Sequence, residues 1–177
     1  MPPDGALTAE QRAVADEAAG GLRGRVPMPL RAWIASPEFG RRAQRLGEFV
    51  RYQTSLPPRL SELAILVTAR FWTSQYEWYV HRKDALASGL APEIIDAIAL
   101  RAEPVFAATD ERLVYAFARA LQETHAIGDT LYADCVEALG ERSVVELVGL
   151  LGYYTLVSMT LNAFAFTAPS DAASLAP

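Results

Sequence analysis

An uncharged, largely apolar stretch from Leu147 to Phe166 restricts most strongly what this sequence can fold into. A helix needs about 20 apolar residues to cross a bilayer, so this segment either spans a membrane or is buried in protein. It contains Gly149, Gly152 and several hydroxyl side chains, and no Lys or Arg follows it as a basic anchor. The sequence therefore predicts a helix buried in a core or a subunit interface, and no membrane partner.

Signals for the start of a helix recur along the rest of the chain, and strand-like alternation of apolar and polar residues is not evident. Most are capping boxes or prolines in a first turn. The sequence therefore predicts an all-α fold, a compact helical bundle of about six to eight helices with short connections. The expected helices cover about residues 9–19, 37–51, 57–73, 75–88, a short segment from 92, 109–124, 129–140 and a segment opened by a Ser143–Glu146 capping box.

One helical domain accounts for most of the chain, because 177 residues fit a single domain comfortably. We assign residues 1–26 to an N-terminal helix and loop, and residues 27–169 to the helical domain. Residues 170–177 are small and polar, and we expect them to be a disordered tail. The first residues resemble no secretion signal, which favours a cytoplasmic protein.

Charge and cysteine content narrow the partners and the compartment further. With a net charge of −5 and no basic stripe, the sequence argues against nucleic acid as a partner. Cys135 is the only cysteine, so a CxxC pair is excluded and a reducing compartment is indicated. We expect Cys135 to be a small buried hydrophobic residue.

The segment 56–90 holds the residues with the clearest chemistry. Glu77 and His81 stand four residues apart, so on a helix they share one face, with Ser74 one turn earlier. Glu62 lies on the preceding helix, and a tight turn near 73–74 would bring it opposite His81. A carboxylate beside His81 would raise the pKa of the imidazole and fix its orientation, which suits an acid or base near neutral pH. Either Glu62 or Glu77 could be that partner.

Arginines of the same region are the candidates for binding an anionic substrate. Arg59, Arg70 and Arg82 are the nearest, and Ser74 and Trp78 could also contact a substrate. A purely structural interpretation stands beside this one, because aromatic residues such as Trp78 at helical spacing are more often part of a core than of a binding site.

The His81 motif also has structural and metal-binding alternatives. His81 could be a hydrogen-bonded structural residue, and Glu77–His81 could be a solvated surface pair worth a few tenths of a kcal/mol. Glu62, Glu77 and His81 could together supply three metal ligands. However, the Glu-x-x-x-His spacing differs from the Glu-x-x-His pattern of ferritin-like metal sites, so we expect no metal.

Several motifs resemble those of the carboxymuconolactone decarboxylase and alkylhydroperoxidase-D superfamily, over roughly residues 27–169. They are Leu56-Pro57-Pro58-Arg59, Tyr76-Glu77-Trp78 with His81, the upstream Ser36-Pro37-Glu38 and the downstream Gly152-Tyr153-Tyr154. The resemblance implies an alkylhydroperoxidase-D-like helical fold and a homo-oligomer, either a dimer, a trimer or a hexamer. The apolar helix with Gly149 and Gly152 fits such a subunit interface.

The chain combines features of two branches of this superfamily. In the peroxidase branch the motif has a Glu, two Cys and a His, at spacings that fall here on Glu62, Ser74, Glu77 and His81. Both cysteines are thus missing, and a hydroxyl cannot cycle through sulfenic acid and a disulfide as a thiolate does. The decarboxylase branch keeps a Glu four residues before a His, which matches Glu77 and His81.

The resemblance implies a cofactor-independent lyase or isomerase, acting by His/Glu acid–base chemistry on a small cyclic or lactone-type carboxylate. In this scheme His81 moves the proton, and Glu62 or Glu77 orients it. The absence of nucleotide and flavin motifs fits chemistry without a cofactor. The alternative is a non-catalytic oligomeric binding protein that kept the fold. A peroxidase acting through Cys135 alone ranks last.

Overall fold

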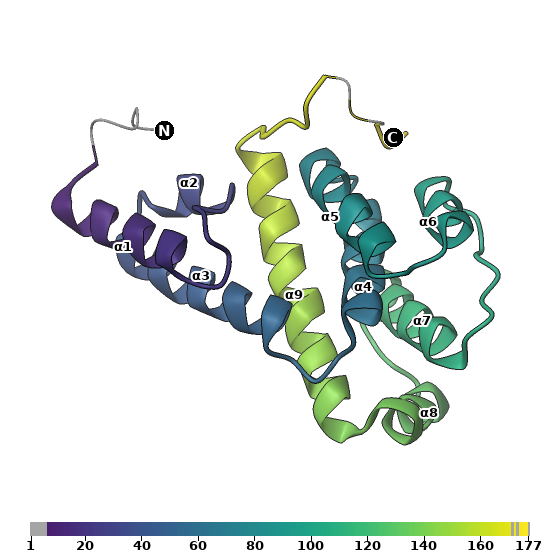
Figure 1. The fold of residues 1–177 in the computed structure, drawn as a ribbon. Helices are drawn as coiled ribbons and strands as arrows, with labels where there is room; N and C mark the ends of the chain where they lie inside the picture. The colour runs from purple at the N-terminus through teal and green to yellow at the C-terminus, as the bar shows by residue number, and fades with distance from the viewer. Residues whose placement is uncertain (1–6, 171, 173, 177) are drawn as a thin grey trace. The chain divides into compact units, whose positions relative to one another are not determined.

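The computed structural model describes residues 7–170, 172 and 174–176. Over these residues the chain is all-helical, with nine helices and no strand (Figure 1). The predicted all-α fold is confirmed. The ninth helix, which the sequence pattern did not indicate, is α2 (Leu30–Trp33), a single turn that follows a loop rich in Gly and Pro.

The chain forms two compact units, Met1–Thr54 and Ser55–Pro177. The first contains α1 (Ala9–Gly20), α2 and α3 (Pro37–Tyr52). The predicted capping box at the start of α1 is present, because Thr8 and Gln11 each accept a hydrogen bond from the other's backbone N–H.

The second unit is arranged around α4, which packs against α5, α6, α7 and α9 (Figure 1). All residues of α4 from Leu60 to Arg70 are buried, as expected for a helix surrounded by others. Two of these buried residues, Glu62 and Arg70, are charged and therefore need partners. The six helices are α4 (Pro58–Phe71), α5 (Gln75–Ala87), α6 (Pro92–Ala99), α7 (Thr109–Glu123), α8 (Asp129–Leu139) and α9 (Glu141–Ala163).

A tight turn connects α4 to α5 and sets the two helices side by side. Thr73 adopts a left-handed backbone with φ 46°, which is uncommon for a β-branched residue. The N–H of Ser74 then donates to the carbonyl of Ala69 at 2.8 Å, which satisfies an otherwise free carbonyl at the end of α4. The predicted break near 73–74 is therefore confirmed.

α9 is the helix formed by the long uncharged stretch. It is long and apolar enough to cross a membrane, but 61% of its most apolar window is buried within the protein. It packs against α4, α5 and α8. The prediction of a buried core helix is confirmed, although one stripe of α9, with Val145, Val148 and Met159, is exposed.

The predicted capping box at Ser143 and Glu146 is wrong. α9 begins three residues earlier than predicted, with Gly140 rather than Ser143 as its N-cap, because Gly140 joins α8 directly to α9 with φ 84° and ψ 151°, a conformation essentially restricted to glycine. Glu146 instead accepts two hydrogen bonds, each 2.6 Å, from the backbone N–H and hydroxyl of Ser55. The Ser55 hydroxyl also shares a 2.8 Å hydrogen bond with Ser143.

The assigned segments 1–26, 27–169 and 170–177 stay predictions, because the two compact units do not define independently folding domains. Part of the expected tail is tied down in the structure. Leu175 is buried, and it exchanges two 2.8 Å hydrogen bonds with the side chain of Gln75. Residues 1–6, 171, 173 and 177 lie outside the described residues.

Candidate active site

Both predicted carboxylates contact His81. Nδ1 of His81 lies 2.6 Å from Oε2 of Glu62, and Nε2 lies 3.0 Å from Oε1 of Glu77. The question that the sequence left open, which Glu is the partner, is answered by the geometry: each ring nitrogen has one carboxylate. We call these three residues the Glu62–His81–Glu77 cluster.

Local structure explains why these side chains meet. Glu77 and His81 lie one turn apart on α5, in the i, i+4 relation that places side chains on one helix face. The tight turn at Thr73 lays α5 against α4, so that Glu62 reaches the opposite edge of the same ring. Tyr154 of α9 packs edge-on against the ring at 5.0 Å between centroids, which further restricts its orientation.

The cluster lies in the interior of the second unit. The His81 side chain is only 2% exposed, whereas the Glu62 and Glu77 side chains are 9% and 6% exposed. Burial acts to lower the pKa of His81, but Glu62 and then Glu77 outweigh it and raise that pKa to about 9. His81 is therefore an imidazolium at neutral pH and donates an N–H to each carboxylate.

The other predicted contact residues are distributed around this core. Arg59 pairs with Asp110 at 2.8 Å and with Glu111, so its charge is already neutralised by α7. Ser74 immediately precedes α5 and is fully buried, and its hydroxyl has no hydrogen-bond partner among the described residues. Trp78 is 2% exposed and belongs to the core. Their roles toward a substrate stay predictions.

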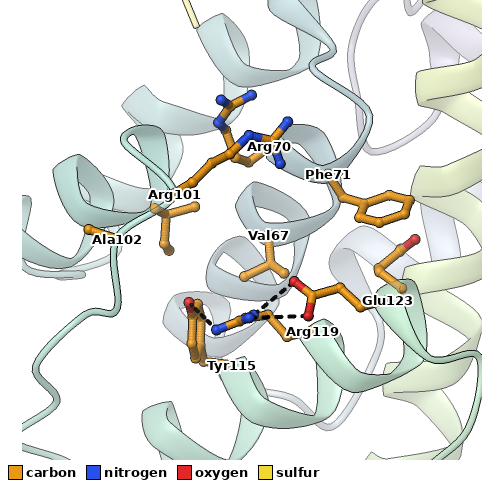
Figure 2. A pocket seen from close by; sticks show the side chains of 10 residues that line it. Val67, Arg70, Phe71, Arg101, Ala102, Tyr115, Arg119 and Glu123 are labelled. Atoms are coloured by element: carbon orange, nitrogen blue, oxygen red, sulfur yellow. Dashed lines mark hydrogen bonds and ion pairs between the residues drawn. The ribbon is translucent and has the colours of Figure 1, made fainter. Parts of the chain in front are cut away.

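Arg70 lines a cavity of about 150 Å³ beside α4, α6 and α7, which Figure 2 shows from close by. A larger hollow of about 500 Å³ lies between the end of α9 and the C-terminal segment. Neither of these two cavities is lined by a residue of the Glu62–His81–Glu77 cluster. The residues around the smaller one are Val67, Arg70, Phe71, Ile98, Arg101, Ala102, Tyr115, Arg119, Gln122 and Glu123.

Comparison with known proteins places this fold and motif in a family. Residues 37–121, which include the whole Glu62–His81–Glu77 cluster, match the carboxymuconolactone decarboxylase family. Over these residues the chain is similar to members of that family. Among curated proteins, no sequence matches it.

Two solved structures share the fold of this chain. One is a protein of unknown function from Agrobacterium tumefaciens, described as a candidate AhpD of antioxidant defence; the TM-score is 0.69 and the identity 18%, over 79% of this chain and 97% of that one. The other is an uncharacterized peroxidase-related protein from Silicibacter sp. TM1040; the TM-score is 0.73 and the identity 16%, over 94% of this chain and 88% of that one. At these identities the likeness concerns the fold alone.

The only thiol of this chain is poorly suited to peroxidase chemistry. Ser74 and Glu77 stand at the two positions that the resemblance assigns to the peroxidase-branch cysteines. Cys135 is fully buried on α8, and burial raises the pKa of its thiol, so little of the reactive thiolate forms near neutral pH. The expectation that Cys135 is a buried residue is confirmed.

A metal would use a different set of ligands from the one considered in the sequence. Glu62, His81 and Asp84 can each offer one ligand atom within 4.8 Å of the others. A metal ion needs a neutral imidazole, whereas the two carboxylates keep His81 protonated. A metal ion at this position would therefore have to displace that proton.

Sequence reasoning missed the other polar residues of the smaller cavity. Arg101 follows α6 and lies 28 residues from Thr73, which it contacts. Tyr115, Arg119 and Gln122 come from α7. No local pattern marks these side chains, because α4, α6 and α7 must first pack together before they converge.

Proposed function

We propose that this protein is a cytoplasmic, cofactor-independent acid–base enzyme, a lyase or isomerase of small cyclic or lactone-type carboxylates. The observation that carries the proposal is the pairing of both His81 ring nitrogens with buried carboxylates, at 2.6 and 3.0 Å. Such a chain of hydrogen bonds conducts a proton from one carboxylate to the other without rotation of the ring. The match of residues 37–121 to the carboxymuconolactone decarboxylase family supports it.

In this proposal His81 does not itself donate a proton to the substrate, as the sequence-based scheme had it. Both of its nitrogens are occupied, and its side chain is less exposed than those of Glu62 and Glu77. In this proposal a carboxyl oxygen, rather than the ring, therefore donates the proton to the reacting carbon. When the substrate loses carbon dioxide, the electron pair left on carbon is delocalised into an adjacent unsaturated group. His81 passes its Nε2 proton to Glu77, Glu77 passes a proton to that carbon, and solvent reprotonates the cluster.

Deuterium incorporation tests this proton transfer even while the substrate is unidentified. Small cyclic carboxylates, including unsaturated lactones, are incubated with the enzyme in D2O and followed by NMR for new C–D bonds and lost carbon dioxide. We expect incorporation with the wild type and a loss of about 100- to 10,000-fold in Glu77→Gln. The matched control is Glu93→Gln, at an exposed position on α6.

Glu77→Gln is preferred to a His81 variant here because it keeps the Glu62–His81 pair and therefore the fold. Circular dichroism confirms that both Glu variants are folded. Turnover of a carboxylate by the wild type that Glu77→Gln leaves unchanged would contradict the proposal.

A second function, a non-catalytic binding protein, is favoured by one observation. The smaller cavity carries cationic side chains but no residue of the Glu62–His81–Glu77 cluster. A protein that binds a ligand there without changing it would show saturable binding and no deuterium incorporation from any compound that binds.

We also propose that the exposed stripe of α9 is a subunit interface in a homo-oligomer. Val145, Val148 and Met159 are 67%, 45% and 50% exposed, and the exposed Gly149 and Gly152 allow a second helix to approach closely. A second copy of the chain is the occupant that a homo-oligomeric family member would place there.

Light scattering coupled to size-exclusion chromatography tests this interface. We expect an oligomer for the wild type and a shift toward the monomer for Val148→Asp, because the change buries a charge in the interface. Val105→Asp is the matched control, since Val105 is 92% exposed and lies in a loop away from α9. A monomeric wild type, or an equal effect of both variants, would rule the interface out.

A further inference from the structure

The cavity beside α4, α6 and α7 has a polar end and an apolar wall. Figure 2 shows Arg70 and Arg101 together at one end, with the buried Val67 below them and Phe71, which is 38% exposed, to one side. Ile98 and Ala102 extend the apolar side. A cavity of about 150 Å³ is large enough to hold a benzene-sized ring.

Arg70 is a buried cation that is held in place by neutral groups. Its side chain donates from Nε to the carbonyl of Ala99 at 3.0 Å and from Nη1 to the hydroxyl of Thr73 at 3.1 Å. The residue is only 5% exposed. Within the described part of the chain, no carboxylate lies within ion-pair distance of Arg70, which is unusual for a buried charge.

Arg101 brings a second positive charge to the same point. Its Nη2 donates to the same Thr73 hydroxyl at 3.3 Å, so the two guanidinium groups share one hydrogen-bond acceptor. Burial, and then the like charge of Arg101, lowers the pKa of Arg70. For Arg101, too, the described residues supply no carboxylate partner. An anion between the two groups would relieve this repulsion.

Arg119, on the opposite wall of the cavity, has carboxylate partners that neutralise its charge. It pairs with Glu103 at 2.7 Å and with Glu123 at 3.0 Å (Figure 2 shows the second pair). The unbalanced charge of the cavity therefore lies at the end formed by Arg70 and Arg101.

We propose that this cavity binds a small organic carboxylate, with its carboxylate between Arg70 and Arg101 and its apolar body against Val67, Phe71 and Ile98. The planar guanidinium matches a carboxylate with two parallel hydrogen bonds. A phosphate ion would satisfy the cations but leave the apolar wall in contact with water. The ligand class is thus an aromatic or cyclic monocarboxylate.

This site is separate from the Glu62–His81–Glu77 cluster. Arg70 follows Glu62 by eight residues on α4, which corresponds to about 12 Å along the helix axis. The contacts of Arg70 with Ala99 and Thr73 hold its guanidinium at the far end of α4. The inference therefore stands whether or not the cluster catalyses a reaction.

Calorimetric titration with benzoate tests the site, and Arg101→Gln is the main variant because Arg101 is exposed and its loss spares the core. We expect benzoate to bind the wild type, and to bind Arg101→Gln about 10- to 100-fold more weakly, since a charged hydrogen bond is lost. Arg112→Gln, an exposed arginine on α7 that lies outside the cavity, should bind as the wild type does.

Two further ligands complete the test. Benzamide has the same ring without the charge, and we expect it to bind at least about tenfold more weakly than benzoate. Inorganic phosphate should also bind more weakly. The assignment is overturned if benzoate does not bind, if Arg101→Gln binds it as the wild type does, or if benzamide or phosphate binds as tightly.

Discussion

Replacing His81 by Gln lowers the free energy of unfolding by about 3–5 kcal/mol at pH 7, the range measured when one partner of a buried ion pair is removed. Glu62 and Glu77 are 7% and 5% exposed, and His81 is the only cation within ion-pair distance of either among the described residues. The variant leaves two buried carboxylates with no positive charge between them. A glutamine amide cannot replace the charge, and it reaches only one of the two.

Urea unfolding followed by circular dichroism measures this loss. The matched control is His125→Asn, because His125 is exposed and its left-handed backbone, with φ 62°, suits asparagine. We expect the control to stay within about 0.5 kcal/mol of the wild type. A His81→Gln variant as stable as the control would show that His81 is not the cation that holds the two carboxylates.

The stability of the wild type falls as the pH rises from about 6.5 to about 9, with a contribution from His81 of about 3 kcal/mol in total. The folded protein keeps a proton on His81 up to a pKa of about 9, whereas the unfolded chain releases it near the ordinary pKa of about 6.5. Folding therefore binds a proton in this window. The contribution is complete below it and lost above it.

The same unfolding experiment at several pH values isolates this contribution. Other groups also titrate at alkaline pH, among them Tyr115 and Cys135, whose pKa values burial raises. They are common to the wild type and to His81→Gln, so the difference between the two curves removes them. A difference that stays constant from pH 6 to pH 10 would contradict a raised pKa of His81.

The helix boundaries were predictable because their signals are local. The Thr8–Gln11 capping box and the prolines at 37, 58 and 92 act within one turn of the backbone that they shape. The prediction failed at Ser143 and Glu146, which match the same capping pattern. Their partner there is Ser55, 88 to 91 residues away, and a contact over that separation has no local signature.

The candidate site likewise contains contacts that local sequence predicts and contacts that depend on how the helices pack. The Glu77–His81 contact follows from helix geometry, and Glu62 could be placed opposite it once a tight turn was expected. That both carboxylates bind the ring at once depends on the left-handed Thr73, a conformation that a β-branched residue does not signal in sequence. The proximity of Arg70 and Arg101 depends on how α4 packs against α6. The sequence alone identified Arg70 only as one of three nearby cations.

The protonation state of His81 decides whether an imidazolium lies between the two carboxylates. The chain has only two histidines, so ¹⁵N-histidine labelling yields two ring spectra, and the His125→Asn variant assigns them. We predict that both ring nitrogens of His81 carry a proton at pH 7 and that the ring titrates near pH 9. A neutral His81 ring at pH 7, with one bare nitrogen, would contradict the imidazolium between two carboxylates on which the proposed proton transfer rests.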